Sequence, residues 1–400
     1  MEFLECLFCQ KKYPLDLFDS FCPDCREPML YPSPPKKRRF YPGKNYPLER
    51  FLDFLPLSKL DASLNLGEGN TPLVKLNRLI ERTSLPNVFA KNETFNPTYS
   101  FKDRGSAVAF QKAVAMGLER IGTVSTGNMA SSTAAYGAKA GLKTFVLLKE
   151  DTSLEKTLSV GIHNPELIRV KGDYGELFTK SFSIGRKYNI YFMNSVDPFR
   201  VEGYKATGFE IFFQLNHRAP QFIFVPLSSG GHLMGLMRAF LDLKKEGFIQ
   251  QVPIFVGVQA QGCAPLAKAF ASGKSKFERI KKAETIAHAI SNPDPAGGNI
   301  SLRMIKENNG MILDVSDEEI IEAQKMLAEL EGIFCQPASA TTLAGLLKFS
   351  KNVKFKTRVN IVLVITGSGL KALKSIESSR INVHQASLSD LENTIGSILK

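Results

Sequence analysis

The sequence Asn96-Pro97-Thr98-Tyr99-Ser100-Phe101-Lys102-Asp103-Arg104-Gly105 decides how the rest of the chain is interpreted. Asn-Pro-Thr is typical of a turn, and Pro97 disfavours helical backbone at Asn96. Apolar residues recur at helical spacing after Lys102, so the pattern predicts a helix that begins near this lysine. A lysine at such a junction is restrained and partly desolvated, and both conditions help its amine to form a Schiff base. The alternative is an exposed lysine at a helix start beside Asp103.

The composition is that of an ordinary globular protein. The 400 residues are 44% hydrophobic and 22% charged, and the length suffices for two or three folded units. No apolar run is long enough to span a bilayer, and we expect no secretory signal at the N-terminus. The net charge of +12 is compatible with nucleic acid, and equally with a small anionic substrate.

Four of the six cysteines form two Cys-x-x-Cys pairs, Cys6 with Cys9 and Cys22 with Cys25. Two such pairs can face one tetrahedral ion, so the spacing predicts a structural zinc ribbon over residues 1–31. A unit this small has almost no core, and metal binding would supply most of its folding free energy. The alternative is a metal-free loop with four reduced cysteines. This cysteine usage favours a reducing compartment, and we expect the cytoplasm.

Residues 32–59 are predicted to be a linker and lead-in to the next unit. Prolines and the basic run Lys36, Lys37, Arg38 and Arg39 favour an extended, solvated segment. A ribbon followed by a basic run is also compatible with a nucleic-acid contact. The solvated linker is the preferred interpretation, because no aromatic side chains interleave with these charges.

Short apolar strands alternate with helical patterns over most of the remaining chain. The predicted strands are residues 88–91, 121–124, 144–148, 168–170, 190–193, 221–225, 254–258 and 359–365. This alternation predicts parallel sheets with helices on their faces. Polar turns follow several of these strands, where open α/β sheets place their ligand sites.

The polar turns carry groups suited to a phosphorylated or aromatic ligand. Asn128 can hydrogen-bond a phenolic oxygen, Arg200 can contact an anion with two N–H groups, and a hydroxyl at Thr366 or Ser368 can face a pyridine nitrogen. The turn Ser228-Ser229-Gly230-Gly231-His232 lets backbone N–H groups at a helix start approach a phosphate. It has neither the dinucleotide nor the Walker spacing. Each turn alone is equally explained by ordinary turn and capping residues.

Taken together, the motifs resemble those of threonine synthases, pyridoxal-phosphate (PLP) enzymes of the tryptophan-synthase-β-like fold, also called fold type II. The resemblance covers about residues 60–375, and some members carry a similar ribbon. The matching segments are 67–73, 96–98, 100–105, 125–128, 194–195 with Arg200, 285–290, 331–333, 337–340 and 366–371. The resemblance implies two doubly wound three-layer α/β/α domains plus the ribbon. The large PLP-binding domain would comprise residues 60–104 and 205–378, the small domain 105–204, and a C-terminal tail 379–400.

The resemblance also implies a chemistry. Lys102 would bond covalently to PLP and move protons. The reaction would be γ-elimination of phosphate from O-phosphohomoserine, followed by β-hydration to give threonine. The implied contacts to PLP are Asn128 on its phenolic oxygen, Ser228, Ser229, Gly230, Gly231 and His232 on its phosphate, and Thr366 on its pyridine nitrogen. The implied substrate-binding residues are Ser125, Thr126, Asn194, Ser195 and Arg200. Relatives are commonly dimeric, which implies a homodimer.

Several positions depart from the family pattern. Tyr99 stands where glycine is usual, Met129 where threonine is usual, and Ser368 where histidine is usual, while the 228–232 loop replaces Gly-Asn-x-Gly-Asn. Other fold type II reactions therefore stay open, either β-replacement on O-phosphoserine, as in cysteate synthase, or a threonine or serine dehydratase. A zinc-ribbon protein that binds nucleic acid through an inactive PLP fold is a less favoured alternative.

Overall fold

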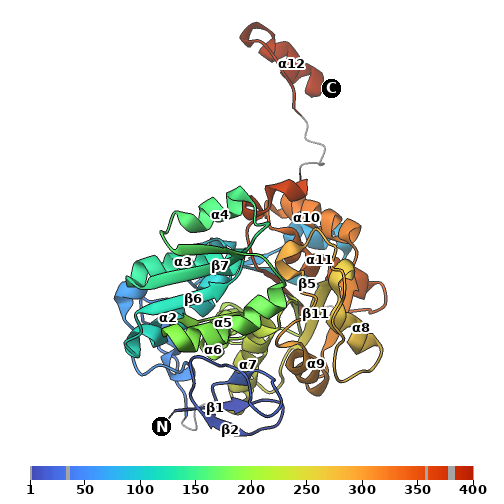
Figure 1. The fold of residues 1–400 in the computed structure, drawn as a ribbon. Helices are drawn as coiled ribbons and strands as arrows, with labels where there is room; N and C mark the ends of the chain where they lie inside the picture. The colour runs from blue at the N-terminus through green and yellow to red at the C-terminus, as the bar shows by residue number, and fades with distance from the viewer. Residues whose placement is uncertain (1, 33–36, 356–358, 377–382, 400) are drawn as a thin grey trace.

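Two α/β lobes and an N-terminal ribbon make up the body of the protein, and a C-terminal helix stands away from it (Figure 1). The computed structural model describes residues 2–32, 37–355, 359–376 and 383–399. Short 3-10 helices connect the main elements at Pro47–Phe54, Ala62–Leu64, Glu93–Phe95, Gln261–Cys263, His288–Ile290, Gly369–Lys371, Leu373–Ile376 and Leu388–Asp390.

The large lobe is built on a six-stranded sheet with the order β12-β11-β10-β13-β5-β4. Its strands are β4 (Leu73–Lys75), β5 (Asn87–Asn92), β10 (Phe222–Pro226), β11 (Ile254–Ala260), β12 (Met311–Val315) and β13 (Asn360–Ile365). Neighbouring strands are parallel except at the edge, where β4 pairs antiparallel with β5. The inner strands β10 and β13 are almost entirely apolar, as expected for a sheet that is covered on both faces.

Alternate residues of these strands enter two different hydrophobic cores. In β13, Ile361 and Leu363 pack in one core, whereas Val362 and Val364 pack in the other. The first core contains side chains of α1 (Asn77–Thr83), α10 (Asp317–Glu331) and α11 (Pro337–Ser350); the second contains those of α2 (Lys102–Ala115), α6 (Pro198–Gln214), α7 (Gly231–Lys245), α8 (Pro265–Ala271) and α9 (Gly298–Glu307). The predicted doubly wound architecture is confirmed.

The small lobe has a four-stranded parallel sheet with the order β8-β7-β6-β9. The strands are β6 (Arg120–Val124), β7 (Lys143–Lys149), β8 (Glu166–Val170) and β9 (Tyr191–Phe192), and the helices are α3 (Asn128–Ala140), α4 (Leu154–Gly161) and α5 (Tyr174–Tyr188). Helices α3 and α4 pack on one set of strand residues and α5 on the other. Helix α3 begins at Asn128, so the polar turn after β6 leads directly into it.

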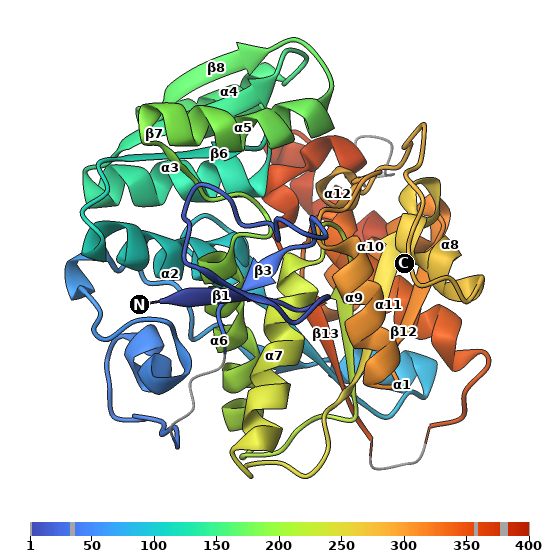
Figure 2. The same ribbon diagram turned by 60° about the horizontal axis from the view of Figure 1, so that its bottom comes forward.

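The N-terminal ribbon has three short antiparallel strands, β1 (Phe3–Cys6), β2 (Lys12–Pro14) and β3 (Met29–Leu30), in the order β2-β1-β3. Figure 2 shows β1 and β3 lying across α6 and α7. The ribbon also reaches the small lobe, where the ring of Phe21 meets Phe178 and Phe182 of α5 edge-on at 6.2 and 5.6 Å. The ribbon therefore contacts helices of both lobes.

The segment after the ribbon is not the solvated linker that its composition predicts. Arg38 is 4% exposed, and its guanidinium pairs with Asp242 at 2.8 Å and Glu246 at 3.1 Å. Phe40 stacks on Phe54 with ring centroids 4.5 Å apart. The prediction is wrong at these residues because Arg38 pairs with acidic groups at the end of α7 and Phe40 packs in an aromatic cluster. Lys37 and Arg39 are exposed, as expected, and Lys36 lies outside the described residues.

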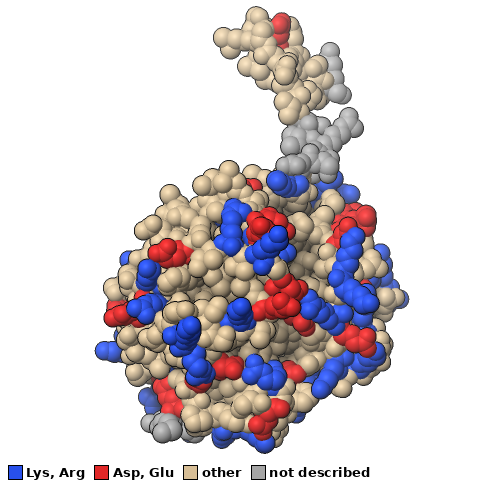
Figure 3. Space-filling model, in the orientation of Figure 1, with Lys and Arg blue, Asp and Glu red and all other residues tan. Residues whose placement is uncertain are grey.

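The inward Arg38 weakens the case for a nucleic-acid-binding run, and basic and acidic side chains are mixed over the face shown in Figure 3. No helix among the described residues is long and apolar enough to cross a membrane. Helix α12 (Leu391–Ile398) is exposed along most of its length.

The domain boundaries remain a proposal. Those after residues 104 and 204 fall inside α2 and α6, so both lobes share these helices. The boundary after residue 378 lies outside the described residues.

Candidate active site

Lys102 is held where the two lobes meet, at the carboxyl ends of the strands of the large sheet. It is the first residue of α2, and the loop before it is hydrogen-bonded to the turn after β13. The amide of Phe101 donates to the carbonyl of Thr366 at 3.0 Å, and the amide of Ser368 donates to the carbonyl of Tyr99 at 3.0 Å. These bonds fix the backbone that presents the lysine.

The amine of Lys102 sits in a mainly aromatic setting. The side chain is half-buried, and its Nζ lies 4.6 Å from the ring centroid of Phe101 and 5.9 Å from that of Tyr204. Burial, and then the positive charge of Arg200, lower the pKa of Lys102 to about 7. No salt bridge to this amine occurs among the described residues. A large fraction of the amine is therefore neutral near pH 7, the form that attacks a carbonyl carbon.

A fully paired charge network lies directly behind this site. Arg104 donates to Glu93 at 2.5 Å, to Glu210 at 2.7 and 2.8 Å and to the hydroxyl of Thr71 at 3.0 Å. Lys91 donates to Glu210 at 2.6 Å and to the carbonyl of Thr71 at 2.7 Å. Burial alone would raise the pKa of Glu210, but Arg104 and Lys91 hold it well below its usual range. Sequence reasoning missed this network, which joins β5, α2 and α6.

The Ser228–His232 loop forms a concave turn between β10 and α7. Gly230 has φ +94°, a left-handed conformation that favours glycine. A Cβ at Gly230 would lie 2.3 Å from Ser301 Oγ, and one at Gly231 would lie 2.3 Å from the carbonyl oxygen of Ser195. Only glycine fits at both positions, and the loop ends at the N-terminus of a helix of 15 residues. Such a turn suits an anion, because its N–H groups and the helix dipole point toward it.

His232 closes this loop with a buried imidazole. The side chain is 7% exposed and stacks on Phe101, with centroids 3.9 Å apart. Burial, and then the charges of Lys102 and Arg104, hold the pKa of His232 well below its ordinary value. Both ring nitrogens lack a hydrogen-bond partner among the described residues. A neutral imidazole here has one donor and one acceptor available to a ligand.

The polar turn after β6 faces the large lobe. Ser125, Thr126 and Asn128 are half-buried, and the Asn128 Nδ2 donates to Gln336 Oε1 at 3.3 Å. The backbone N–H of Gln336 in turn donates to the carbonyl of Gly367 at 3.0 Å. Asn128 therefore lies close to the turn after β13. Sequence reasoning did not single out Gln336, although it directly precedes the 337–340 segment.

The hydroxyl of Thr366 is buried at the end of β13. Its Oγ1 lies 2.9 Å from the hydroxyl oxygen of Ser339 on α11, and the side chain is 3% exposed. Ser339 also accepts from the amide of Gly367 at 3.0 Å. These bonds hold the Thr366 hydroxyl at the same sheet edge as Lys102.

Arg200 and Asn194 differ in how many partners they have. Arg200 is fully buried; its Nη1 reaches Thr133 at 3.5 Å, while Nε and Nη2 have no partner among the described residues. Asn194 accepts from the amide of Val124 at 2.9 Å and donates to Ser181 at 3.1 Å. Arg200 has free donors for an anion, whereas the Asn194 amide already joins β6 to α5. Its predicted role in substrate binding gains no support from this geometry.

The four ribbon cysteines come together as their spacing predicts. The Sγ atoms of Cys6 and Cys25 lie 3.5 Å apart, those of Cys9 and Cys22 lie 3.6 Å apart, and all four are within 4.8 Å of one another. A tetrahedral zinc with Zn–S bonds of about 2.3 Å requires sulfur separations of about 3.8 Å. The arrangement fits one such ion.

Comparison with known proteins agrees with the resemblance that the sequence motifs indicate. The family model described as "Pyridoxal-phosphate dependent enzyme" matches residues 64–367. The chain is 38% identical over 323 residues to a threonine synthase of Methanocaldococcus jannaschii, covering 80% of each protein, and 35% identical over 323 residues to one of Methanosarcina acetivorans, covering 80% and 79%. The chain belongs to the threonine synthase family of PLP-dependent enzymes.

Solved structures show the same overall fold. Threonine deaminase isoform 2 from Solanum lycopersicum superposes with a TM-score of 0.68, 20% identity and coverage of 89% of this chain and 100% of the other. Maize serine racemase gives a TM-score of 0.64 at 17% identity, covering 83% and 93%. At these identities the likeness concerns the fold alone.

The residues of this threonine synthase-family chain fit PLP. Lys102 offers an amine of lowered pKa, the 228–232 loop offers a cradle at a helix start, and His232 and Arg200 offer buried polar atoms that have no partner in the described parts of the chain. A phosphorylated aldehyde needs this combination of an amine and anion-binding donors.

Proposed function

We propose that this protein converts O-phosphohomoserine and water into threonine and inorganic phosphate. Membership of the threonine synthase family supports the reaction class. The observation that carries the proposal is the amine of Lys102, whose pKa is lowered to about 7 and which faces the buried, partly unpaired Arg200. A reactive amine beside an unsatisfied guanidinium suits a substrate with an amino acid end and a phosphate end.

Residues of both lobes would hold PLP. Lys102 would form the covalent bond, Asn128 would donate to the phenolic oxygen, and the Thr366 hydroxyl would face the pyridine nitrogen. The phosphate would lie against Ser228, Ser229, Gly230, Gly231 and His232. When bound, PLP supplies an electron sink that stabilises negative charge at the substrate α-carbon.

The protein would position the substrate and move its protons. Arg200 would clamp the substrate phosphate with its free N–H groups, and Ser125, Thr126 and Ser195 would contribute further polar contacts to the substrate. Lys102 Nζ would take the proton from the α-carbon and help to move a proton from the β-carbon while the γ-carbon–oxygen bond to phosphate breaks. The γ-carbon would then gain a proton, the oxygen of water would bond to the β-carbon as water gives up one proton to solvent or to the released phosphate, and Lys102 would return a proton to the α-carbon.

The remaining assignments follow from the same chemistry. We propose a zinc ion bound by Cys6, Cys9, Cys22 and Cys25, since their sulfur spacing fits a tetrahedral ion. None of the six cysteines forms a disulfide in the part of the chain that the structure describes, which suits a reducing compartment, and the cytoplasm is the proposed location. A homodimer is proposed from the family resemblance.

Product analysis tests the reaction. The PLP-loaded enzyme is incubated separately with O-phosphohomoserine, O-phosphoserine, threonine and serine, and phosphate, threonine and keto acid are measured. We expect stoichiometric phosphate and threonine from O-phosphohomoserine, and no product with Lys102→Ala. Phosphate from O-phosphoserine alone would indicate β-replacement, and keto acid from threonine or serine would indicate a dehydratase; either result contradicts the proposal.

A further inference from the structure

Both cysteine knuckles of the ribbon are fixed to one helix of the large lobe, α9. In the first knuckle, Arg303 Nη1 donates to the carbonyl oxygens of Leu7 and Phe8 at 3.2 and 2.8 Å. Leu7 and Phe8 are the two residues between Cys6 and Cys9. The loop that presents these two thiols therefore contacts α9 directly.

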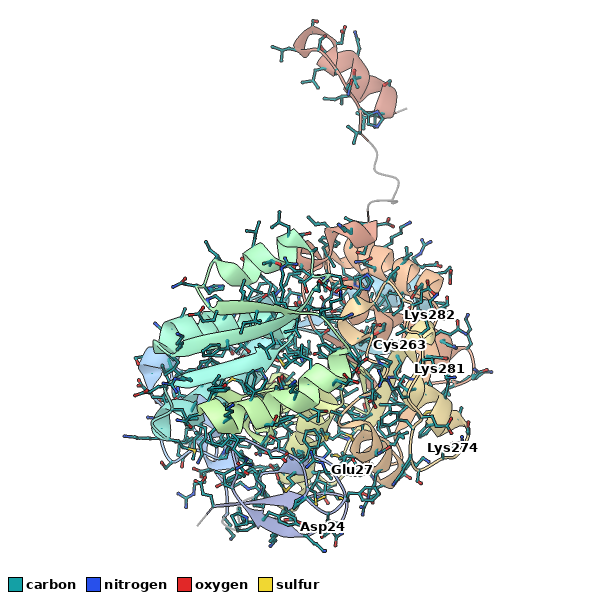
Figure 4. All side chains as sticks on the ribbon, in the orientation of Figure 1. Asp24, Glu27, Cys263, Lys274, Lys281 and Lys282 are labelled. Carbon is teal, nitrogen blue, oxygen red and sulfur yellow. The ribbon has the colours of Figure 1, made fainter. Side chains whose placement is uncertain are left out.

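The second knuckle reaches the same helix one turn earlier. Glu27 follows Cys25 closely, and its carbonyl accepts from the amide of Cys22 at 2.8 Å. The Glu27 carboxylate is 8% exposed and accepts from Asn299 Nδ2 at 2.7 Å. Figure 4 shows Glu27 where the ribbon meets the body, whereas Asp24 lies on the outer side of the ribbon. Asn299 and Arg303 are four residues apart, so both face the ribbon.

The N-terminus of α9 also packs against the loop proposed to hold the PLP phosphate. The amide of Gly297, the residue before α9, donates to the carbonyl of Ser229 at 2.9 Å. Ser301 Oγ lies so close to Gly230 that a Cβ there would come within 2.3 Å. Helix α9 is thus a short rigid element between the four thiols and the 228–232 loop.

We propose that Glu27 and Arg303 are positioning residues, which couple metal binding in the ribbon to cofactor affinity through α9. With metal bound, the knuckles are ordered and hold Asn299 and Arg303, and α9 keeps Gly297 and Ser301 against the loop. Without metal the ribbon has almost no core to keep these contacts in place. The inference rests on the proposed function, which supplies both the zinc and the PLP.

The test measures the affinity of cofactor-free enzyme for PLP, followed by its visible absorbance. Glu27→Ala removes the acceptor for Asn299, while Glu27→Gln retains an amide oxygen in its place. Asp24→Ala is the matched control, because Asp24 pairs with the exposed Lys11 within the ribbon. We expect Glu27→Ala to weaken PLP binding by about 3- to 30-fold, the range typical of coupling through packed elements. Glu27→Gln and Asp24→Ala should bind like the unmodified protein.

Metal removal provides the second arm of the test. Chelation of the unmodified enzyme should weaken PLP binding and zinc should restore it, with secondary structure followed by circular dichroism. Saturation with PLP should tighten zinc binding by the same factor, because coupling between two sites is reciprocal. If Glu27→Ala loses its metal or fails to fold, Arg303→Ala tests the same path from the side of α9 and should weaken PLP binding in the same range.

The outcomes separate this inference from the proposed function. An unmodified enzyme that never gains a Lys102-dependent absorbance band contradicts the proposed function and, with it, the coupling. A normal band whose PLP affinity is the same with and without metal overturns the coupling alone. The same holds if Arg303→Ala binds PLP like the unmodified protein.

Discussion

Two buried cationic clusters lie side by side at the start of α2, and they differ in how completely they are paired. Arg104 pairs with Glu93 and Glu210, and Lys91 pairs with Glu210, with every contact between 2.5 and 3.0 Å. Lys102 has no acidic partner among the described residues, and two guanidinium nitrogens of Arg200 have no partner there. The first cluster is paired through direct contacts within the protein; in the second, the buried Asp197 interacts with Arg200 through its charge but forms no salt bridge with it among the described residues.

The difference indicates which side of α2 is scaffold and which is site. Buried charges cost several kcal/mol unless they are paired, so a fold retains unpaired ones where a ligand completes them. The Arg104 cluster fixes β5, α2 and α6, and thereby the backbone of Lys102. The second cluster, Lys102 and Arg200, can bind an anion, and the phosphate groups of PLP and of the substrate are such anions.

Breaking the paired cluster should have the largest effect on stability. Glu210→Ala leaves two buried cations with Glu93 as their only acid, so we expect a loss of about 3–5 kcal/mol in the free energy of unfolding. The measurement is denaturant unfolding of the cofactor-free protein. Glu322→Ala, an exposed substitution on α10, serves as control and should change stability by less than about 0.5 kcal/mol. A similar small change for Glu210→Ala contradicts the scaffold role.

Breaking the unpaired cluster should affect the substrate rather than the fold. Arg200→Gln removes charge-assisted hydrogen bonds to phosphate, and we expect KM for O-phosphohomoserine to rise by about 10- to 100-fold. The absorbance band of PLP should persist, and stability should change little, because among the described residues Arg200 forms no direct salt bridge and interacts with Asp197 only through its charge. Arg82→Gln, on an exposed face of α1, is the control. A normal KM for Arg200→Gln would remove Arg200 from the substrate site.

The pH dependence of PLP addition tests the unpaired cluster through the titration of Lys102. Burial, followed by the charge of Arg200, places its pKa at about 7, and only the neutral amine attacks the aldehyde of PLP. The rate of PLP addition to cofactor-free protein should rise about tenfold per pH unit below pH 6 and level off above about pH 8. Arg200→Gln removes a like charge and should shift the midpoint to higher pH. A midpoint near the usual lysine pKa in the unmodified protein would show that the amine is not desolvated.

The smallest expected effect concerns the strain in the lysine loop. Tyr99, which replaces the usual glycine, has φ +60° and a ring that is 55% exposed. Tyr99→Gly relieves the left-handed strain but frees the unfolded chain, so we expect a net change within about 1 kcal/mol and normal PLP binding. Calorimetric unfolding measures it. A loss of several kcal/mol would mean that the Tyr99 ring has a packing role that its exposure does not show.

Features of the structure that depend on local sequence patterns were predictable. Apolar strands such as 359–365 and the polar turns after them gave the two sheets and the position of Lys102. The paired network was not predictable, because Lys91 and Glu210 are 119 residues apart and each looks like an ordinary helix or strand residue. Arg38 was placed in solvent for a similar reason, since its partners Asp242 and Glu246 lie more than 200 residues away.

Individual contacts in the site were also beyond the sequence. The spacing placed Asn194 after a strand, yet only the structure shows that its amide is already bonded to Val124 and Ser181. Asn128 donates a hydrogen bond to Gln336 across the space between the lobes, and no motif predicts this contact. Such contacts depend on how separate elements meet rather than on the pattern within any one of them.

Borohydride trapping tests the central claim most directly. PLP-loaded enzyme is reduced, digested and mapped by mass spectrometry to find which lysine carries the cofactor. The unpaired amine of Lys102 should carry it in full, while Lys91, which is fully buried and bonded to Glu210, should carry none. Modification of Lys91 or another lysine, or no modification at all, would contradict the account.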